Sequence, residues 1–442
     1  MNTEEIIERA RLKDFESNYR QAVTEFLDSV VPHLKAQNAT DEDFRRLERL
    51  LLPERIVTFK VVWENDAGAL EHNLGYRVQF NSVLGPYKGG LRFDTTVTED
   101  VLKFLAFEQI FKNSLTGLPL GGGKGGSDFN PKGKSDREIQ RFCVAFMTEL
   151  VRHIGPNTDV PAGDMGVGTR EIGYLYGAYK RLTNKTDGAL TGKGVSYNGS
   201  HGRIEATGYG AIYFIKHVLK QAGTELSGKR LAISGSGNVA VHAALKAAEE
   251  QALVLTLSDR GGYVFAEKGL SVEFIERVKT LKAKGDPLST MTLPDGVVYK
   301  EGTFWDKVSA DVFVPCATQN EINEVTAEAI IDCKPLLVAE GANMPLTLEA
   351  IKLVQQAGIL LAPAKAVNAG GVSVSGIEMT QNAGHEPWTP QEVDAALQDI
   401  MKNIHDVCVK YGGLEDGKVD YVKGANIGGF VRVFQAMTEL GW

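Results

Sequence analysis

The chain opens with charged residues interrupted by apolar ones at helical intervals, from about residue 6 to residue 55. Apolar positions three or four residues apart lie on one face of an α-helix. The opening stretch therefore predicts amphipathic helices, and its apolar positions include Phe15, Tyr19, Val23, Phe26 and Leu27.

Two strand-like runs follow this helical stretch. They cover residues 55–63 and 74–81, and the turn-rich segment 65–68 between them predicts a hairpin. A further helix is expected to open at Thr98, whose hydroxyl can cap its N-terminus, and to end near Gly117.

From Lys229 onward the pattern changes to short apolar runs that alternate with helical segments. Alternation of this kind is typical of a parallel, doubly wound sheet with helices on both faces. The sequence therefore predicts an α/β protein with strands at residues 231–234, 253–257, 312–314, 336–339 and 359–362.

Composition limits the classes of function. A chain of 442 residues, 43% of them hydrophobic, is too long for one core, so two domains are expected. The net charge of -8 argues against a nucleic-acid partner. The acidic N-terminus is unlike a targeting peptide, and no run of about 20 apolar residues offers a membrane span, so we expect a cytoplasmic protein. The cysteines are far apart and indicate neither disulfides nor a metal site: Cys143, Cys316, Cys333 and Cys408.

A dinucleotide-binding fingerprint stands at residues 231–240. The strand is followed by Gly235, Gly237 and Ala240 at GxGxxA spacing and then by an alanine-rich helix. Gly235 permits the tight turn, Gly237 lets the backbone approach a pyrophosphate, and the helix N-terminus attracts its charge. With a second strand and Asp259 at the expected offset of about 20 residues, a dinucleotide site is favoured over a structural turn.

Three lysines occur in unusual sequence contexts: Lys88 in a glycine-rich segment, Lys112 in a helix, and Lys124 among the glycines of residues 121–126. Gln109 and Lys112 are three apart and share a helix face, which suits them to grip a carboxylate. The glycines would let a ligand approach Lys124 closely. The alternative of a phosphate-binding P-loop lacks the GxxxxGK[ST] spacing.

Asp164 precedes a helical segment in which Thr169 is a plausible cap. From the pattern alone, a turn-forming aspartate and a catalytic one are equally supported.

Five segments together carry a resemblance to one known family: residues 85–93, 121–126, 161–166, 205–210 and 368–372. Through them the chain closely resembles the hexameric glutamate dehydrogenases of the Glu/Leu/Phe/Val dehydrogenase family. The resemblance covers nearly the whole length in the right order.

The resemblance implies a substrate-binding and oligomerisation domain over residues 1–200, with a returning C-terminal helix over residues 420–442. It implies a Rossmann-like dinucleotide-binding domain over residues 201–419. The implied activity is the reversible oxidative deamination of L-glutamate to 2-oxoglutarate and ammonium by a homohexamer.

The resemblance also implies roles for individual residues. Lys124 would act as acid or base and Asp164 would shuttle a proton to and from the substrate nitrogen. Lys88 and Ser375 would hold the side-chain carboxylate of glutamate. The residues Gln109, Lys112 and the Gly163 backbone would hold its α-carboxylate, and Arg203, Thr207, Asn238, Val239 and Asn343 would surround the cofactor.

The preferred cofactor is expected to be NADP rather than NAD. An acid after the second strand, here Asp259, ordinarily marks NAD. However, Ser258 precedes it and Arg260 follows it, and a hydroxyl and a guanidinium both suit a 2′-phosphate. A serine–aspartate pair at this place also resembles the NADP-using members of the family.

Two departures from the family pattern, Ile204 for proline and Ala364 for glycine, are expected to affect affinity or domain closure rather than the reaction type. Two alternatives stay open. A branched-chain or aromatic amino-acid dehydrogenase needs an apolar pocket, which Lys88 argues against. A non-catalytic hexameric scaffold has no need for both Lys124 and Asp164.

Overall fold

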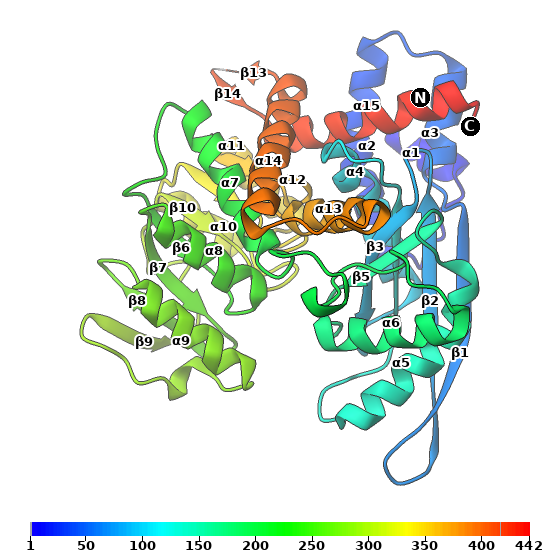
Figure 1. The fold of residues 1–442 in the computed structure, drawn as a ribbon. Helices are drawn as coiled ribbons and strands as arrows, with labels where there is room; N and C mark the ends of the chain where they lie inside the picture. Colours follow the sequence, from blue (N-terminus) through cyan, green and yellow to red (C-terminus); the bar gives the residue numbers. More distant parts are fainter. Residues whose placement is uncertain (1, 416) are drawn as a thin grey trace. The chain divides into compact units, whose positions relative to one another are not determined.

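The computed structural model describes residues 2–415 and 417–442, which form two compact units (Figure 1). Unit 1 contains the chain up to His201 together with Val372–Val393 and Asn426–Trp442. Unit 2 contains Gly202–Gly371 and Asp394–Ala425. The substrate-binding and cofactor-binding roles of the two predicted domains stay predictions at this point.

Unit 1 begins with the amphipathic helices that the periodicity predicts: α1 (Thr3–Arg9), α2 (Ser17–Ala36) and α3 (Asp41–Leu50). Phe26 of α2 is fully buried and stacks on Phe111, at 4.2 Å between ring centroids. Phe15 was expected on the same apolar face, but this is wrong: it precedes α2 and is 76% exposed.

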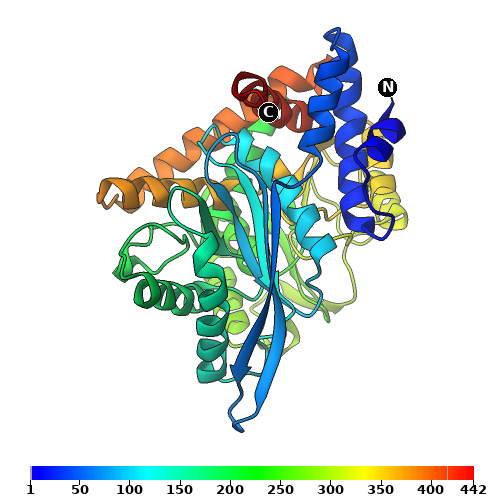
Figure 2. The same ribbon diagram turned by 90° about the vertical axis from the view of Figure 1, so that its right-hand side faces the viewer.

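The sheet of unit 1 has the strand order β1-β2-β4-β3-β5. The predicted hairpin is confirmed as β1 (Arg55–Glu64) and β2 (Leu70–Asn81), and it extends to a tip beyond the other strands (Figure 2). The next three strands are β3 (Tyr87–Phe93), β4 (Gly122–Ser127) and β5 (Asp159–Gly163), of which β3 runs parallel to both β4 and β5. The helices of this unit that follow are α4 (Glu99–Leu115), with Thr98 as its cap, α5 (Asp136–Leu150), α6 (Thr169–Thr183), and the greater part of α13 (Gly370–Gly384) and α15 (Tyr421–Leu440).

The glycine segment around Lys124 is a buried strand, β4. A Cβ atom at Gly122 would lie 2.5 Å from the side chain of Ile110 in α4, and one at Gly123 would lie 3.0 Å from the Val78 carbonyl. A Cβ at Gly125 would lie 3.0 Å from Cδ of Arg77. The expectation that these glycines leave room for a ligand is therefore wrong, because the protein itself fills that space.

The sheet of unit 2 has the order β12-β11-β10-β6-β7-β8-β9. Its first five strands are parallel, which confirms the predicted α/β class and strands. Two antiparallel strands at the edge, β8 and β9, were not predicted. The strands are β6 (Arg230–Ile233), β7 (Leu253–Ser258), β8 (Gly262–Ala266), β9 (Val297–Glu301), β10 (Val312–Val314), β11 (Leu337–Ala339) and β12 (Leu360–Ala362).

Helices accompany this sheet as the alternating pattern predicts. They are α7 (Ala206–Gln221), α8 (Asn238–Glu249), α9 (Val272–Ala283), α10 (Glu324–Asp332), α11 (Leu348–Gln356), α12 (Ala364–Val367) and α14 (Pro390–Gly412). A short two-stranded ribbon, β13 (Leu414–Glu415) and β14 (Lys418–Val419), completes the elements. Among the described residues, no helix is both long and apolar enough to cross a membrane.

Candidate active site

Lys124 and Asp164 meet in unit 1, where Nζ of Lys124 lies 3.2 Å from Oδ2 of Asp164. Arg92 of β3 donates a hydrogen bond of 2.9 Å from Nε to the same oxygen. The Lys124 side chain is 6% exposed and that of Asp164 is 21% exposed. Lys124 and Arg92 thus both contact one oxygen of the Asp164 carboxylate, which remains partly exposed to solvent. Arg92 was missed by the sequence reasoning, although it stands in the segment that carries the family resemblance.

The charges of this cluster shift both ionisation equilibria. Burial lowers the pKa of Lys124, since water is removed from its charged form. Asp164 opposes that shift, whereas Arg92 and Arg77 add to it. Burial alone would raise the pKa of Asp164, but the Lys124 and Arg92 cations outweigh it and hold that pKa well below its usual range. The site therefore favours an ionised carboxylate beside an amine that loses its proton more readily than usual.

The turn after β5 fixes the position of Asp164. The Val167 N–H donates to the Asp164 carbonyl at 2.9 Å, and the Phe93 N–H donates to the Met165 carbonyl at 2.9 Å, so the turn is tied to β3. The following helix α6 starts at Thr169, and the residue in the cap position is Gly168, so the prediction of Thr169 as the cap is wrong.

Lys88 is completely buried in β3, and its ammonium donates a hydrogen bond of 2.8 Å to Oγ1 of Thr191. Asn113 of α4 ties this region together, because it donates to the Lys88 carbonyl at 3.1 Å and accepts from Gln109 at 2.7 Å. Thr191 was not predicted as a site residue. It lies in an irregular segment, where no periodicity marks an inward-facing side chain.

The remaining predicted substrate residues lie on elements of the same unit. Lys112 is half-buried one turn after Gln109 in α4. Gly163 ends β5 opposite Leu91 of β3. Ser375 is buried in α13, at 1% exposure.

In unit 2 the glycine fingerprint forms the expected strand–turn–helix. Gly235 has φ of +83°, a backbone conformation that favours glycine, and its N–H donates to Oγ of Ser258 at 2.8 Å. Gly237 occupies the N-cap position of α8, and a Cβ added there would meet nothing within 4 Å. Asn238 and Val239 form the first turn of α8. The open backbone at this helix N-terminus fits a pyrophosphate.

Asp259 is engaged by its own turn. Its carboxylate accepts from the Leu288 N–H at 2.7 Å and from the Gly261 N–H at 3.1 Å, and it lies 3.1 Å from Nζ of Lys282 in α9. Arg260 beside it is exposed. The end of β7 therefore presents a neutralised acid beside an exposed arginine. Lys282 was not predicted, because it lies 23 residues from Asp259 along the chain.

The other predicted cofactor residues also fall in unit 2. A Cβ at Gly371 would lie 2.5 Å from Oγ1 of Thr207 and 3.3 Å from Nη1 of Arg203, so both side chains lie beside Gly371. Asn343 is exposed and accepts a hydrogen bond of 2.9 Å from Asn368. Of the two departures from the family pattern, the Ile204 carbonyl accepts from Asn238 at 2.6 Å and the Ala364 N–H donates to Glu340 at 2.8 Å.

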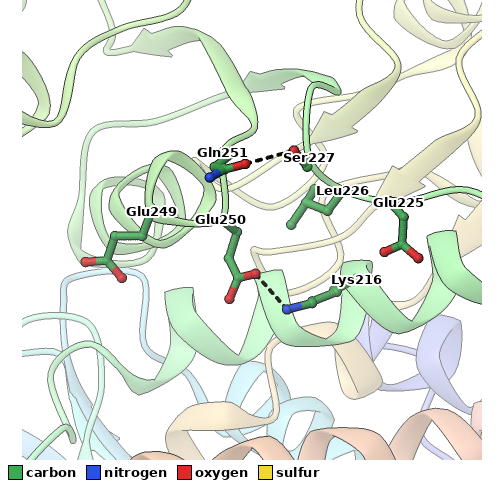
Figure 3. A pocket seen from close by; sticks show the side chains of 7 residues that line it. All are labelled: Lys216, Glu225, Leu226, Ser227, Glu249, Glu250 and Gln251. Atoms are coloured by element: carbon green, nitrogen blue, oxygen red, sulfur yellow. Dashed lines mark hydrogen bonds and ion pairs between the residues drawn. The ribbon is translucent and has the colours of Figure 1, made fainter.

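A hollow of about 300 Å³ in unit 2 contains none of these predicted residues (Figure 3). Lys216 and Glu250 form an ion pair of 2.6 Å in its wall. It is lined by Lys216, Glu225, Leu226, Ser227, Glu249, Glu250 and Gln251. No group of three or more His, Cys, Asp or Glu in the part of the chain that the structure describes is arranged to hold a metal ion.

Comparison with known proteins places this geometry in context. Residues 198–441 match the family model of glutamate/leucine/phenylalanine/valine dehydrogenase, and residues 53–181 match that of the Glu/Leu/Phe/Val dehydrogenase dimerisation domain. The chain is 50% identical to an NAD-specific glutamate dehydrogenase of Bacteroides fragilis, over 100% of both chains. It is also 50% identical to an NADP-specific glutamate dehydrogenase of Escherichia coli, over 96% of this chain and 95% of that one.

A solved structure agrees. The crystal structure of Plasmodium falciparum glutamate dehydrogenase superposes with a TM-score of 0.95 at 46% identity, over 100% of this chain and 94% of that chain. Family models that together match most of the chain, and relatives of this identity over the full length, establish its family. The chain belongs to the Glu/Leu/Phe/Val dehydrogenase family.

Proposed function

We propose that the protein is a glutamate dehydrogenase that converts L-glutamate reversibly to 2-oxoglutarate and ammonium with NADP. The observation that carries this proposal is the Lys124–Asp164 pair at 3.2 Å, in the same unit as the buried ammonium of Lys88. The pair supplies acid–base chemistry, and Lys88 selects an acidic side chain. The names of the full-length relatives support the same activity.

Lys124 and Asp164 divide the proton transfers between them. Lys124, whose pKa is lowered, activates the water that attacks the iminium form of the substrate. Asp164, held ionised by Arg92 and Lys124, exchanges a proton with the substrate nitrogen. The nicotinamide, when bound, supplies the acceptor for hydride from the substrate Cα.

Two sets of residues orient glutamate for these steps. Lys88 and Ser375 bind the side-chain carboxylate, while Gln109, Lys112 and the Gly163 backbone bind the α-carboxylate. Lys88 is fully buried, so binding of an anion there replaces the water that the ammonium lost on folding.

Unit 2 would hold the dinucleotide. Its pyrophosphate would be held by Gly235, Gly237, Asn238 and Val239 at the N-terminus of α8. Arg203, Thr207 and Asn343 complete the surroundings of the cofactor.

Recognition of the 2′-phosphate depends on the end of β7. Ser258 accepts from the Gly235 N–H, which leaves its own hydroxyl proton to donate to a phosphate. Asp259 is neutralised by Lys282 and turned into its own loop, so it does not repel that phosphate. Arg260 adds an exposed positive charge. The relatives include NAD-specific, NADP-specific and NAD(P)-specific enzymes, so similarity to them does not decide the cofactor. The proposal of NADP therefore rests on Ser258, Asp259 and Arg260.

A leucine, valine or phenylalanine dehydrogenase would place an apolar side chain against Lys88, at a high desolvation cost. A non-catalytic scaffold would not need the Lys124–Asp164 pair. A homohexameric assembly and a cytoplasmic location belong to the proposal as well; one relative of solved structure, from Thermus thermophilus, is described as hetero-hexameric.

The test is the absorbance of the reduced nicotinamide with glutamate, leucine, valine or phenylalanine as sole substrate, in the presence of NADP or NAD. Glutamate with NADP should give the highest kcat/KM. Activity confined to leucine, valine or phenylalanine would contradict the proposal that glutamate is the substrate. Absence of turnover with all four amino acids would favour the non-catalytic scaffold. A higher kcat/KM with NAD than with NADP would contradict the proposed preference for NADP. An NADP preference unchanged in Arg260→Ala would keep NADP and remove Arg260 as its cause.

A further inference from the structure

Glu378 of α13 binds an irregular segment of unit 1 through several contacts. Its Oε2 accepts from the Gly192 N–H at 2.8 Å, and its Oε1 lies 2.7 Å from Nζ of Lys193. The Lys193 N–H also points to Oε1, at 3.4 Å, and Nζ of Lys193 donates to the Leu190 carbonyl at 2.5 Å. The Glu378 carboxylate thus binds the backbone directly at Gly192, the residue after Thr191. Through Lys193 it also binds the backbone at Leu190, the residue before Thr191.

The Lys193 and Glu378 side chains are both 0% exposed. Removing two charges from water is costly, so a buried ion pair is weak evidence for stability. What such a pair does provide is a fixed geometry, because any displacement leaves a charge buried without its partner. The conformation of Gly192 fits this arrangement, since its φ of +85° is the left-handed region that glycine adopts readily.

The residue held by this arrangement is Thr191. Its N–H donates to the Pro161 carbonyl of β5 at 3.0 Å, and its hydroxyl accepts from Lys88 at 2.8 Å. Because the oxygen of Thr191 accepts from Lys88, its own proton remains to donate to an anion.

Ser375 stands on the same face of α13 as Glu378, three residues earlier. Gln381 and Asn382 continue this row and bind Ser200 and the Asn198 carbonyl, at 3.1 and 2.9 Å. Glu378 is the charged member of the row and the one that grips the segment around Thr191. It therefore ties the segment that carries one hydroxyl to the helix that carries another.

We propose that Glu378, through Lys193 and Gly192, is a positioning residue for recognition of the substrate's side-chain carboxylate: it sets Thr191 and Ser375 beside Lys88 without touching the substrate. This inference rests on the proposed function. Selectivity for a substrate with a side-chain carboxylate then depends on the buried Lys193–Glu378 ion pair, which does not itself contact the substrate.

The test compares glutamate with norvaline, which has a methyl group in place of the side-chain carboxylate. In Glu378→Gln an NH₂ group, which cannot accept, replaces one of the two carboxylate oxygens, so in the present geometry either the Gly192 N–H or the Lys193 ammonium loses its acceptor. Because misplacement by about 1 Å can cost about a hundredfold in rate, the ratio of kcat/KM for glutamate to that for norvaline should fall at least about tenfold. The fall should come mainly from a raised KM for glutamate.

A matched control is available in the same unit. Glu16 and Lys103 form a second buried ion pair, at 3.0 Å, and their side chains are 3% and 7% exposed. Glu16→Gln should lower thermal stability and leave the glutamate-to-norvaline ratio unchanged. If Glu378→Gln does not fold, the double variant Glu378→Met/Lys193→Met removes both buried charges and should show the same fall in the ratio.

An unchanged ratio in a folded variant would overturn the role of Glu378. So would an equal fall of the ratio in Glu16→Gln, because the effect would then follow from lost stability alone. A wild-type protein inactive on glutamate would instead overturn the proposed function, which keeps the two failures distinguishable.

Discussion

Two ion pairs in the sheet of unit 1 have opposite surroundings. Arg77 reaches from β2 to Asp159 of β5, with both side chains 0% exposed, and its Nε lies 2.9 Å from Oδ2. Gln79 donates to the same carboxylate at 2.9 Å, and Arg77 donates to the Gly89 carbonyl at 3.1 Å. This pair is closed, and its charges are matched within the protein.

The Lys124–Asp164 pair differs in both respects. Arg92 adds a second cation to one carboxylate, and 21% of the Asp164 side chain stays exposed. The cluster of three side chains carries an excess of positive charge and an open side, which suits an anionic substrate. Burial of an ion pair therefore does not by itself indicate function. An excess of charge in a cluster that is partly exposed, as at Asp164, does indicate it.

The glycines of β3 and β4 connect the two pairs. Arg77 lies across these strands, since a Cβ at Gly125 would come within 3.0 Å of its Cδ and one at Gly123 within 3.5 Å of its Nη2. Small residues are therefore needed for Arg77 to reach Asp159 two strands beyond β4. The same positive charge contributes to the lowered pKa of Lys124.

Breaking the closed pair should give the largest effect. Arg77→Met leaves the Asp159 carboxylate buried without its cation, and removal of one partner of a buried pair costs about 3–5 kcal/mol. Urea-induced unfolding of the variant and the wild type measures this loss of stability. A loss below about 1 kcal/mol, the range of exposed pairs, would show that the pair does not hold the sheet.

Breaking the open pair should affect turnover instead of stability. Lys124→Met should lower kcat at least about a hundredfold, the usual scale for losing a positioned acid or base. Because burial disfavours the charged form of Lys124 in the folded state, its removal should change the unfolding free energy by less than about 1 kcal/mol. Steady-state kinetics and urea unfolding of one preparation give both numbers. Near-wild-type turnover would remove Lys124 from the catalytic role.

Removing the second cation should have a smaller effect, visible in the pH dependence. Arg92 favours the ionised form of Asp164 and the neutral form of Lys124, so Arg92→Leu should raise the pKa of both groups. Each limb of the kcat/KM profile that reports one of them should move to higher pH, by about one unit. Arg92→Lys keeps the charge and should stay near the wild-type profile. Identical profiles for all three proteins would show that Arg92 has no electrostatic role.

Much of the scaffold follows from local patterns in the sequence. The hairpin of β1 and β2, the cap of α4 at Thr98 and the glycine turn at Gly235 each depend on residues close together in the chain. Glycine is rare in strands, so composition concealed β3 and β4. The glycines are tolerated there because neighbouring backbone, Ile110 and Arg77 fill the space of the missing side chains.

The candidate site was predictable where chemistry and family resemblance coincide, as for Lys88, Lys124 and Asp164. It was not predictable where a residue acts through partners distant in sequence. Thr191 contacts Lys88, which is 103 positions away, and Glu378 binds Lys193, 185 positions away. The glycines near Thr191 (Gly188, Gly192 and Gly194) indicate a turn but do not indicate Lys88 as a partner, so the fold alone reveals these contacts.

The assignment of proton transfer to Asp164 is tested most directly by Asp164→Asn, which keeps the shape of the carboxylate and loses its charge. Equilibrium binding of glutamate in the presence of NADP, followed by kcat on the same preparation, separates binding from chemistry. We expect glutamate to bind with wild-type affinity and kcat to fall at least about a hundredfold. Wild-type turnover, or a loss of activity explained entirely by lost glutamate binding, would contradict the assignment of Asp164 to proton transfer.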